Sequence, residues 1–129
     1  MTKRIYLAGP PYADEYRARA AVLVAAIGCE PVDPMRRDFR GATEGREAEI
    51  VHGDLADIDS CGAVLASFTA PDEGTAMECW YAQSRGIPVV VYTGGTPVHP
   101  WTMYVASSVH ATLDDAVRAA GTDGTLRDV

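Results

Sequence analysis

Short, nearly continuous apolar runs alternate with longer stretches of helical character, and this alternation limits the possible folds more than any other feature of the chain. The clearest run, Ile87–Tyr92, has a proline near its start and then three consecutive valines, which are typical of a strand. The runs do not alternate apolar with polar residues, so we expect strands that are buried on both faces. Strands alternating with helices predict a three-layer, doubly wound α/β fold with a parallel sheet of about five strands.

Gly, Pro and Asp residues are common at turns and at the ends of helices and strands, so their positions give the approximate bounds of these elements. The loop 35–46 is polar, and the tail 122–129 is expected to be frayed. Strands are predicted at Ile5–Gly9, Glu30–Val32, Ala63–Phe68 and Ile87–Tyr92, and helices at Asp14–Ile27, Glu47–Ile58, Thr75–Ser84, Trp101–Val109 and Thr112–Ala120.

Ligands of such sheets bind at the carboxyl ends of the strands, near the point where the strand order reverses. The segments that follow the strands should therefore surround one mouth. They are Tyr6–Tyr12, Asp33–Arg37, Thr69–Gly74 and Thr93–His99.

Size, composition and charge favour a small globular protein with a small-molecule partner. A chain of 129 residues predicts a single domain spanning residues 1–129. The net charge of −7 counts against a nucleic-acid polymer as partner, because such binding needs a surplus of Lys and Arg. No apolar run has membrane-spanning length, and the N-terminus lacks the apolar segment of a signal peptide. We therefore expect no membrane association and a cytoplasmic location.

The metal-binding and cofactor-binding patterns are missing from the sequence. The three cysteines are widely spaced with no CxxC pair, and we interpret them as buried thiols. The three histidines lack metal-ligand spacing and a partner nucleophile. No GxGxxG or GxxxxGK[ST] motif follows the first strand. The sequence predicts no metal and no cofactor.

The segment from Asp72 to Glu78 carries the strongest candidate for chemistry. It joins a predicted strand to a predicted helix, where Gly74 allows a sharp turn or the close approach of a ligand. A Glu78 in the first helical turn would be favoured in its ionised form, as a nucleophilic carboxylate requires. The alternative is structural: Thr75 and Glu78 match a capping box, and Asp72 is an ordinary turn residue.

Several short segments in this order resemble the nucleoside 2-deoxyribosyltransferase family between about Lys3 and Met103. They are KRIYLAGP at residues 3–10, Asp54 followed by Ile58, DEGTAME at 72–78, Tyr81-Ala82, and GIPV at 86–89. The resemblance implies a flavodoxin-like, Rossmann-like sheet and a double displacement at the anomeric carbon of a nucleoside, a reaction of nucleotide metabolism and salvage.

The resemblance also implies roles for four side chains. Glu78 matches the nucleophile that forms a covalent glycosyl-enzyme, and Tyr6 matches the tyrosine that orients it. Asp72 matches an aspartate that holds the sugar, and Asp54 matches the aspartate that protonates or holds the leaving base. Such an acid needs a raised pKa, from burial or from the nearby Asp57 and Asp59. Without the resemblance, Asp54 is equally well a solvated helix residue.

Further residues are expected to contact the substrate. Met103 matches a position where a neighbouring subunit completes the pocket, so a homodimer or higher homo-oligomer is implied. Trp101 stands where the family has an asparagine, and packing is the commoner use of a tryptophan. The remaining candidates for substrate binding are Gly9, Pro10, Tyr12, Gly74 and Thr75.

Two reactions and one non-catalytic role compete. The first reaction transfers the 2-deoxyribosyl group to another base, and we favour it. The second hydrolyses a nucleoside 5′-monophosphate and needs a phosphate site, although Pro10 and Pro11 remove two backbone donors from the first loop. A nucleotide-binding module without activity is disfavoured because all four candidate side chains are present. Candidates for phosphate contacts are Arg17 and Arg19, and after the second strand Arg36, Arg37 and Arg40.

Overall fold

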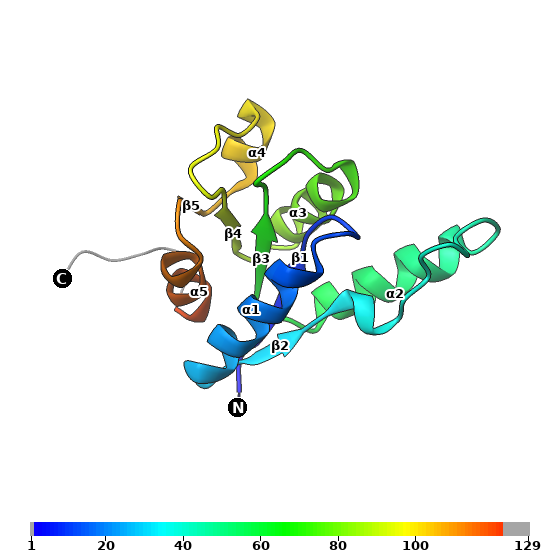
Figure 1. The fold of residues 1–129 in the computed structure, drawn as a ribbon, viewed down its shortest axis with the longest axis horizontal. Helices are drawn as coiled ribbons and strands as arrows, with labels where there is room; N and C mark the ends of the chain where they lie inside the picture. Colours follow the sequence, from blue (N-terminus) through cyan, green and yellow to red (C-terminus); the bar gives the residue numbers. More distant parts are fainter. Residues whose placement is uncertain (1, 123–129) are drawn as a thin grey trace.

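A five-stranded parallel sheet forms the centre of the molecule in a computed structural model that describes residues 2–122 (Figure 1). The strands lie in the order β2-β1-β3-β4-β5, and every neighbouring pair is parallel. This is the order of flavodoxin-like sheets, so the predicted fold class is confirmed. The strands are β1 (Arg4–Ala8), β2 (Glu30–Val32), β3 (Ala63–Ser67), β4 (Val89–Tyr92) and β5 (Ser108–His110).

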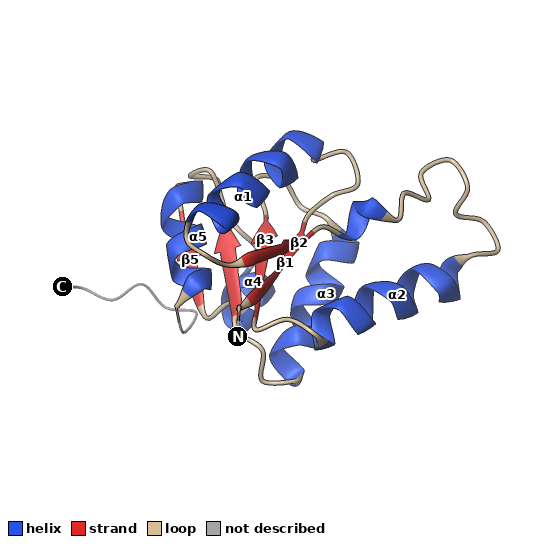
Figure 2. Ribbon diagram, turned by 90° about the horizontal axis from the view of Figure 1, so that it is seen from below, coloured by secondary structure: helices blue, strands red, loops and turns tan. Residues whose placement is uncertain are grey.

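Helices cover both faces of the sheet and complete the three layers. Helices α1 and α5 pack on one face, and α3 lies on the other with α2 and α4 beside it (Figures 1 and 2). The helices are α1 (Asp14–Ala26), α2 (Glu47–Asp59), α3 (Glu73–Ser84), α4 (Pro100–Val105) and α5 (Leu113–Gly121), and a short 3₁₀ turn, η1 (Pro34–Arg36), opens the predicted loop 35–46.

Successive residues of each central strand enter two different apolar cores. In β1, Ile5 and Leu7 belong to the core under α1 and α5, whereas Tyr6 and Ala8 belong to the core under α2, α3 and α4. All four are fully buried, as expected for a strand covered on both sides. The alternation places the Tyr6 side chain on the α3 side of the sheet, where the candidate site lies.

The predicted helix 101–109 is wrong in its second half. Helix α4 ends at Val105, Ala106 takes an extended conformation with φ −68° and ψ 135°, and β5 follows at the edge of the sheet. This strand is three residues long and only partly buried, so it lacks the apolar run that marks the other strands. The following helix begins where predicted, because the Thr112 side chain caps it by accepting a hydrogen bond from the Asp115 amide.

The remaining sequence expectations concern thiols, metals and the tail. Cys61 and Cys79 are buried, as predicted, whereas Cys29 is partly exposed, and all three are free thiols. Within residues 2–122, no group of three His, Cys, Asp or Glu side chains is placed to hold a metal ion. None of the described helices is both long and apolar enough to span a bilayer. Apart from Thr122, the predicted frayed tail lies outside the described residues.

Candidate active site

A cavity of about 500 Å³ opens beside the carboxyl ends of β1, β2 and β3. Helices α2 and α3 contribute to its walls, and it adjoins the point between β1 and β3 where the strand order reverses. Much of the lining is apolar, with a small set of polar groups, as in most small-molecule sites. The main polar and charged side chains that line it are Arg37, Arg40, Asp54, Asp72, Glu78 and Tyr81.

Glu78 and Tyr6 form the central contact of this cavity. The Tyr6 hydroxyl donates a short hydrogen bond to Oε2 of Glu78, which joins β1 to α3 across 72 residues of sequence. Tyr6 is fully buried, so its ring is fixed by packing. Glu78 is partly exposed through the cavity, while its carboxyl group is closely surrounded by protein atoms. The phenol therefore sets the direction in which the carboxyl group points.

Burial dominates the electrostatics of this pair. It raises the pKa of Glu78 to about 8; the Tyr6 hydrogen bond lowers this pKa, and the charges of Asp54 and Asp72 raise it. Burial, followed by the negative charge of Glu78, also raises the pKa of Tyr6, so the phenol stays protonated and remains a donor. The cavity thus holds a carboxyl group whose ionisation is poised near neutral pH, a property common at functional sites.

The predicted reason for an ionised Glu78 is wrong. Helix α3 begins at Glu73, so Glu78 is its sixth residue and lies beyond the first turn, where free amides would favour a carboxylate. The capping box is also wrong, because the N-cap is Asp72 and Glu78 is engaged with Tyr6. Gly74 lies inside the helix with no positive φ, so the sharp turn expected there does not occur.

Asp72 closes the start of α3. Its Oδ2 accepts hydrogen bonds from the Thr75 amide at 3.0 Å and from the Thr75 hydroxyl at 2.6 Å. Thr75 is buried, and both residues line the cavity together with Gly74. These contacts tie Asp72 to the helix that carries Glu78. The carboxylate of Asp72 therefore stabilises the start of α3, besides any contact that it makes with substrate.

Removing the Asp72 cap should lower stability. Asp72→Ala leaves the Thr75 amide without its acceptor, and we expect a loss of about 1 kcal/mol in the free energy of unfolding, measured by urea denaturation. Asp72→Asn keeps an acceptor oxygen and should retain most of the stability. Equal stability of Asp72→Ala and the wild type would contradict the capping role.

Asp54 lies on α2 with two charged neighbours. Nη2 of Arg37 is 3.4 Å from Oδ1 of Asp54 and 2.8 Å from Oδ2 of Asp57. Burial raises the pKa of Asp54, Arg37 opposes this rise, and the charge of Asp57 adds to it. The direction agrees with the predicted need for a raised pKa. Asp59 is engaged elsewhere, because it accepts the hydroxyl of Tyr81.

The loop after β1 is held by a buried arginine. Arg17 is 1% exposed and donates to the carbonyl oxygens of Pro10 and Pro11 at 2.7 and 2.9 Å and to Asp14 at 3.1 Å. With these donors occupied and no place in the cavity lining, Arg17 is not disposed to bind a phosphate there. Arg19 is exposed and lines a different hollow.

The other predicted substrate contacts divide into two groups. Gly9 lines the cavity, and a Cβ there would lie 3.1 Å from the Tyr16 ring, so packing alone explains the glycine. Pro10 is buried and Tyr12 is 72% exposed, and neither lines the cavity. The structure therefore brings only part of the predicted set together.

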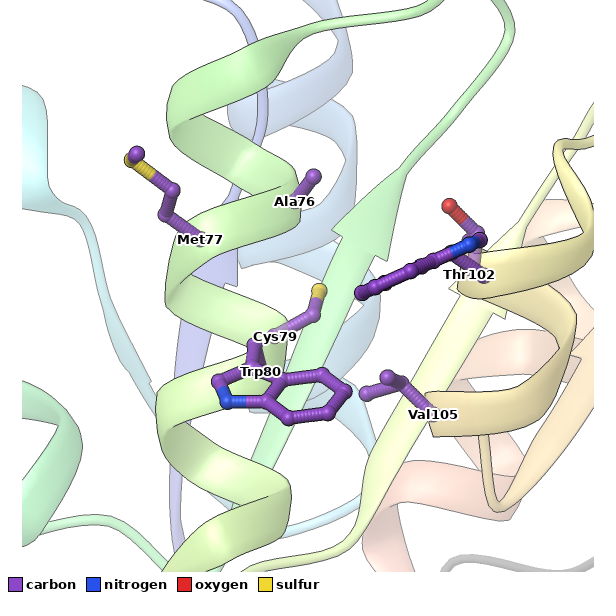
Figure 3. Close-up of a pocket in the computed structure, with 7 residues that line it drawn as sticks. Ala76, Met77, Cys79, Trp80, Thr102 and Val105 are labelled. Atoms are coloured by element: carbon purple, nitrogen blue, oxygen red, sulfur yellow. The ribbon is translucent and has the colours of Figure 1, made fainter.

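Trp101 and Met103 lie on α4, on the side of α3 that faces away from the cavity of Glu78. Trp101 and Trp80 line an apolar pocket of about 310 Å³ between α3 and α4, shown in Figure 3, with ring centroids 5.9 Å apart. Met103 is 51% exposed on α4. Within one copy of the chain, neither residue lines the cavity of Glu78. A contribution to a neighbouring subunit's site stays a prediction.

Sequence reasoning missed several cavity residues. Tyr81 appeared only as part of a motif, and Arg37 and Arg40 only as possible phosphate ligands, yet all three line the cavity. The apolar wall from the loop after η1 and from α2 was not predicted either. A glycine at position 53 inside an otherwise helical segment was the available signal, since it marks a close approach to the helix backbone.

Comparison with known proteins agrees with this fold. The model of the family described as nucleoside 2-deoxyribosyltransferase matches residues 5–118. A 2-deoxyribosyltransferase from Bacillus psychrosaccharolyticus superposes with a TM-score of 0.73 at 18% identity, over 88% of this chain and 90% of that one. A 2-deoxyribosyltransferase from Leishmania mexicana is 28% identical over 73% of this chain and 66% of its own, with a TM-score of 0.59.

A relative with a different reaction shares the fold. The CMP N-glycosidase of Clostridium botulinum superposes with a TM-score of 0.63 at 15% identity, over 90% of this chain and 95% of its own. Comparison with curated protein sequences gives no match. At identities this low, likeness to the transferase from Bacillus and to the glycosidase establishes the shared fold alone.

Proposed function

Because the chain belongs to the nucleoside 2-deoxyribosyltransferase family, we propose that it cleaves the N-glycosidic bond of a 2-deoxynucleoside and transfers the sugar to another nucleobase. The family match and the structural neighbours support an enzyme of the deoxyribosyltransferase or N-glycosidase type that acts on a nucleoside or nucleotide. The observation that carries the proposal is the hydrogen bond from Tyr6 to Glu78 at the cavity.

In the first step, an ionised Oε of Glu78 attacks C1′ of the sugar. A C1′–O bond forms, the C1′–N bond breaks, and its electron pair goes to the departing base. Asp54 transfers its proton to that base as the bond breaks and becomes a carboxylate. In the second step, a nitrogen of another base attacks C1′, Glu78 leaves, and Asp54 takes the proton that the incoming base loses.

Tyr6 and Asp72 position the reacting groups. The phenol of Tyr6 occupies one lone pair of Glu78, which leaves the other oxygen for attack. Asp72 stands at the start of the same helix and lines the cavity, in a place suited to hold a sugar hydroxyl. These roles use the same side chains that the family resemblance selects.

Hydrolysis of a nucleoside 5′-monophosphate is the second candidate, since a structural neighbour is a CMP N-glycosidase. Arg40 lines the cavity and could meet a phosphate, but it is paired with Asp14 and Asp38. Arg17 is occupied by the loop that it holds. Because the ion pairs of Arg40 and the loop contacts of Arg17 compete with a phosphate, transfer from an unphosphorylated nucleoside is the favoured reaction.

Incubation with and without a second base separates the two reactions. We expect a new nucleoside when deoxyinosine or deoxycytidine is mixed with a different free base, analysed by chromatography. Free base released from the 5′-monophosphate, with no new nucleoside formed, would contradict transfer and favour hydrolysis. Binding of nucleosides without release of any base would leave only the non-catalytic module.

The active unit is proposed to be a homodimer or a higher homo-oligomer. The exposed Trp101 and Met103 side chains on α4 support this, because they lie outside their own chain's cavity and are free to approach a neighbour's. Mass measurement in solution, combined with Met103→Ala, tests it: loss of activity without loss of assembly would place Met103 at a neighbour's site.

A further inference from the structure

A glycine in the middle of α2 lies directly beneath the guanidinium group of Arg37. A Cβ at Gly53 would be 3.2 Å from Nε and Nη2 of Arg37 and 3.3 Å from its Cζ. Glycine is a poor helix former, so a mid-helix position has a reason when another group needs to approach the backbone. Here the missing side chain lets the guanidinium lie against the helix, next to Asp54.

Arg37 and Asp54 both line the cavity, and each keeps polar atoms that their mutual ion pair does not use. Nη2 of Arg37 makes both ion pairs, with Asp57 at 2.8 Å and with Oδ1 of Asp54 at 3.4 Å. Among residues 2–122, no hydrogen-bond partner is found for Nη1 of Arg37 or for Oδ2 of Asp54. The two side chains, whose Nη2 and Oδ1 atoms are 3.4 Å apart, therefore bring a guanidinium donor and a carboxyl oxygen to the same cavity.

We propose that Arg37 and Asp54 together select a nucleobase whose edge carries two adjacent hydrogen-bond acceptors. The inference rests on the proposed function, in which Asp54 holds the proton that it gives to the leaving base. In that state both side chains are donors, so they match two neighbouring acceptors and oppose an edge that presents a donor.

Two kinds of base have such an edge. A 6-oxopurine offers N7 and O6, and cytosine offers N3 and O2. Adenine instead places its amino group beside N7, and uracil places an N–H between its two carbonyl oxygens. When the bond to the sugar breaks and Asp54 loses its proton to the base, the charge of Arg37 stabilises the carboxylate that results.

A purely structural role for Arg37 makes a different prediction. The pair with Asp57 ties the segment after η1 to α2, so losing it would reduce stability and lower activity on every substrate by a similar factor. The ratio of activities between two bases would then stay constant. Substrate ratios therefore separate base selection from structural support.

The test measures base release from deoxyinosine, deoxyadenosine, deoxycytidine and deoxyuridine. We expect kcat/KM for deoxyinosine over deoxyadenosine, or for deoxycytidine over deoxyuridine, to be about tenfold or more in the wild type. Arg37→Gln should bring the ratio close to one, because an amide can turn to offer either a donor or an acceptor. Arg37→Lys retains a donor and should keep part of the preference.

Gly53→Ala isolates the placement of Arg37. Its methyl group requires the guanidinium to shift by a few tenths of an ångström, which should reduce the preference, while the better helix propensity of alanine offsets any weakening of the pair with Asp57, so the melting temperature should change little. Arg118→Gln, in an ion pair with Asp115 on α5, is the matched control and should behave like the wild type.

The two nucleoside pairs show which base provides the two adjacent acceptors. Preference confined to the purine pair assigns a 6-oxopurine, and preference confined to the pyrimidine pair assigns cytosine. Equal or faster release of adenine and uracil by the wild type overturns the inference, as does an unchanged ratio in Arg37→Gln. Absence of base release from all four nucleosides and their monophosphates contradicts the proposed function itself.

Discussion

Glu78→Ala is expected to lower the rate of base release on the order of 10³-fold or more while leaving the protein folded. The substitution removes the oxygen that attacks C1′, and among residues 2–122 no other carboxyl group accepts the Tyr6 hydroxyl. A large loss follows because a covalent route depends on its nucleophile. Initial rates on deoxynucleosides, measured together with thermal melting, give the two quantities that are needed.

Two variants control for this result. Glu78→Gln keeps the shape and still accepts the Tyr6 hydrogen bond, so it should be equally inactive and at least as stable near neutral pH. Glu73→Ala changes an exposed acid on the same helix and should retain activity. A folded Glu78→Ala variant with wild-type rates would end the covalent mechanism.

Stability should fall as pH rises between about 4.5 and about 8, because of Glu78. Its pKa is about 8 in the folded protein against 4.5 as its ordinary value, so over this interval the folded state holds a proton that the unfolded chain has released. The contribution is complete below pH 4.5 and is lost as pH passes 8. One pKa unit corresponds to about 1.4 kcal/mol, so the change amounts to a few kcal/mol.

The difference between the wild type and Glu78→Gln isolates this effect, since glutamine does not titrate and other acids cancel. Urea unfolding at several pH values should give a wild-type free energy that declines relative to the variant. A difference that stays flat with pH would show that Glu78 is ionised throughout. Activity should follow a bell-shaped pH profile, because attack requires an ionised Glu78 and departure of the base requires a protonated Asp54.

The sheet was predictable because its signal is local and strong. The strands at residues 63–67 and 89–92 are short runs bounded by turn residues, and their burial between two layers of helices leaves them largely apolar. β5 escaped prediction because an edge strand of three partly buried residues carries no such pattern. Pairing with β4, which no local window contains, makes it a strand.

The candidate site was predictable only in part, for a related reason. Tyr6, Asp54, Asp72 and Glu78 stand in ordered motifs, so their positions could be compared with a family. The contact of Arg37 with Gly53 joins a loop to a helix, and nothing in the spacing of the two residues predicts it. The pKa of Glu78 depends on tertiary burial, which overrode the local argument from the helix start.

The side chain of Arg17, rather than a bound substrate, holds part of the entrance of the cavity in shape. Its guanidinium already satisfies carbonyl oxygens in the β1–α1 connection and also lies 3.7 Å from Asp33 after β2. Two of the segments that border the cavity are thus held by one buried side chain. We therefore expect these two segments to lose little conformational entropy when a substrate binds.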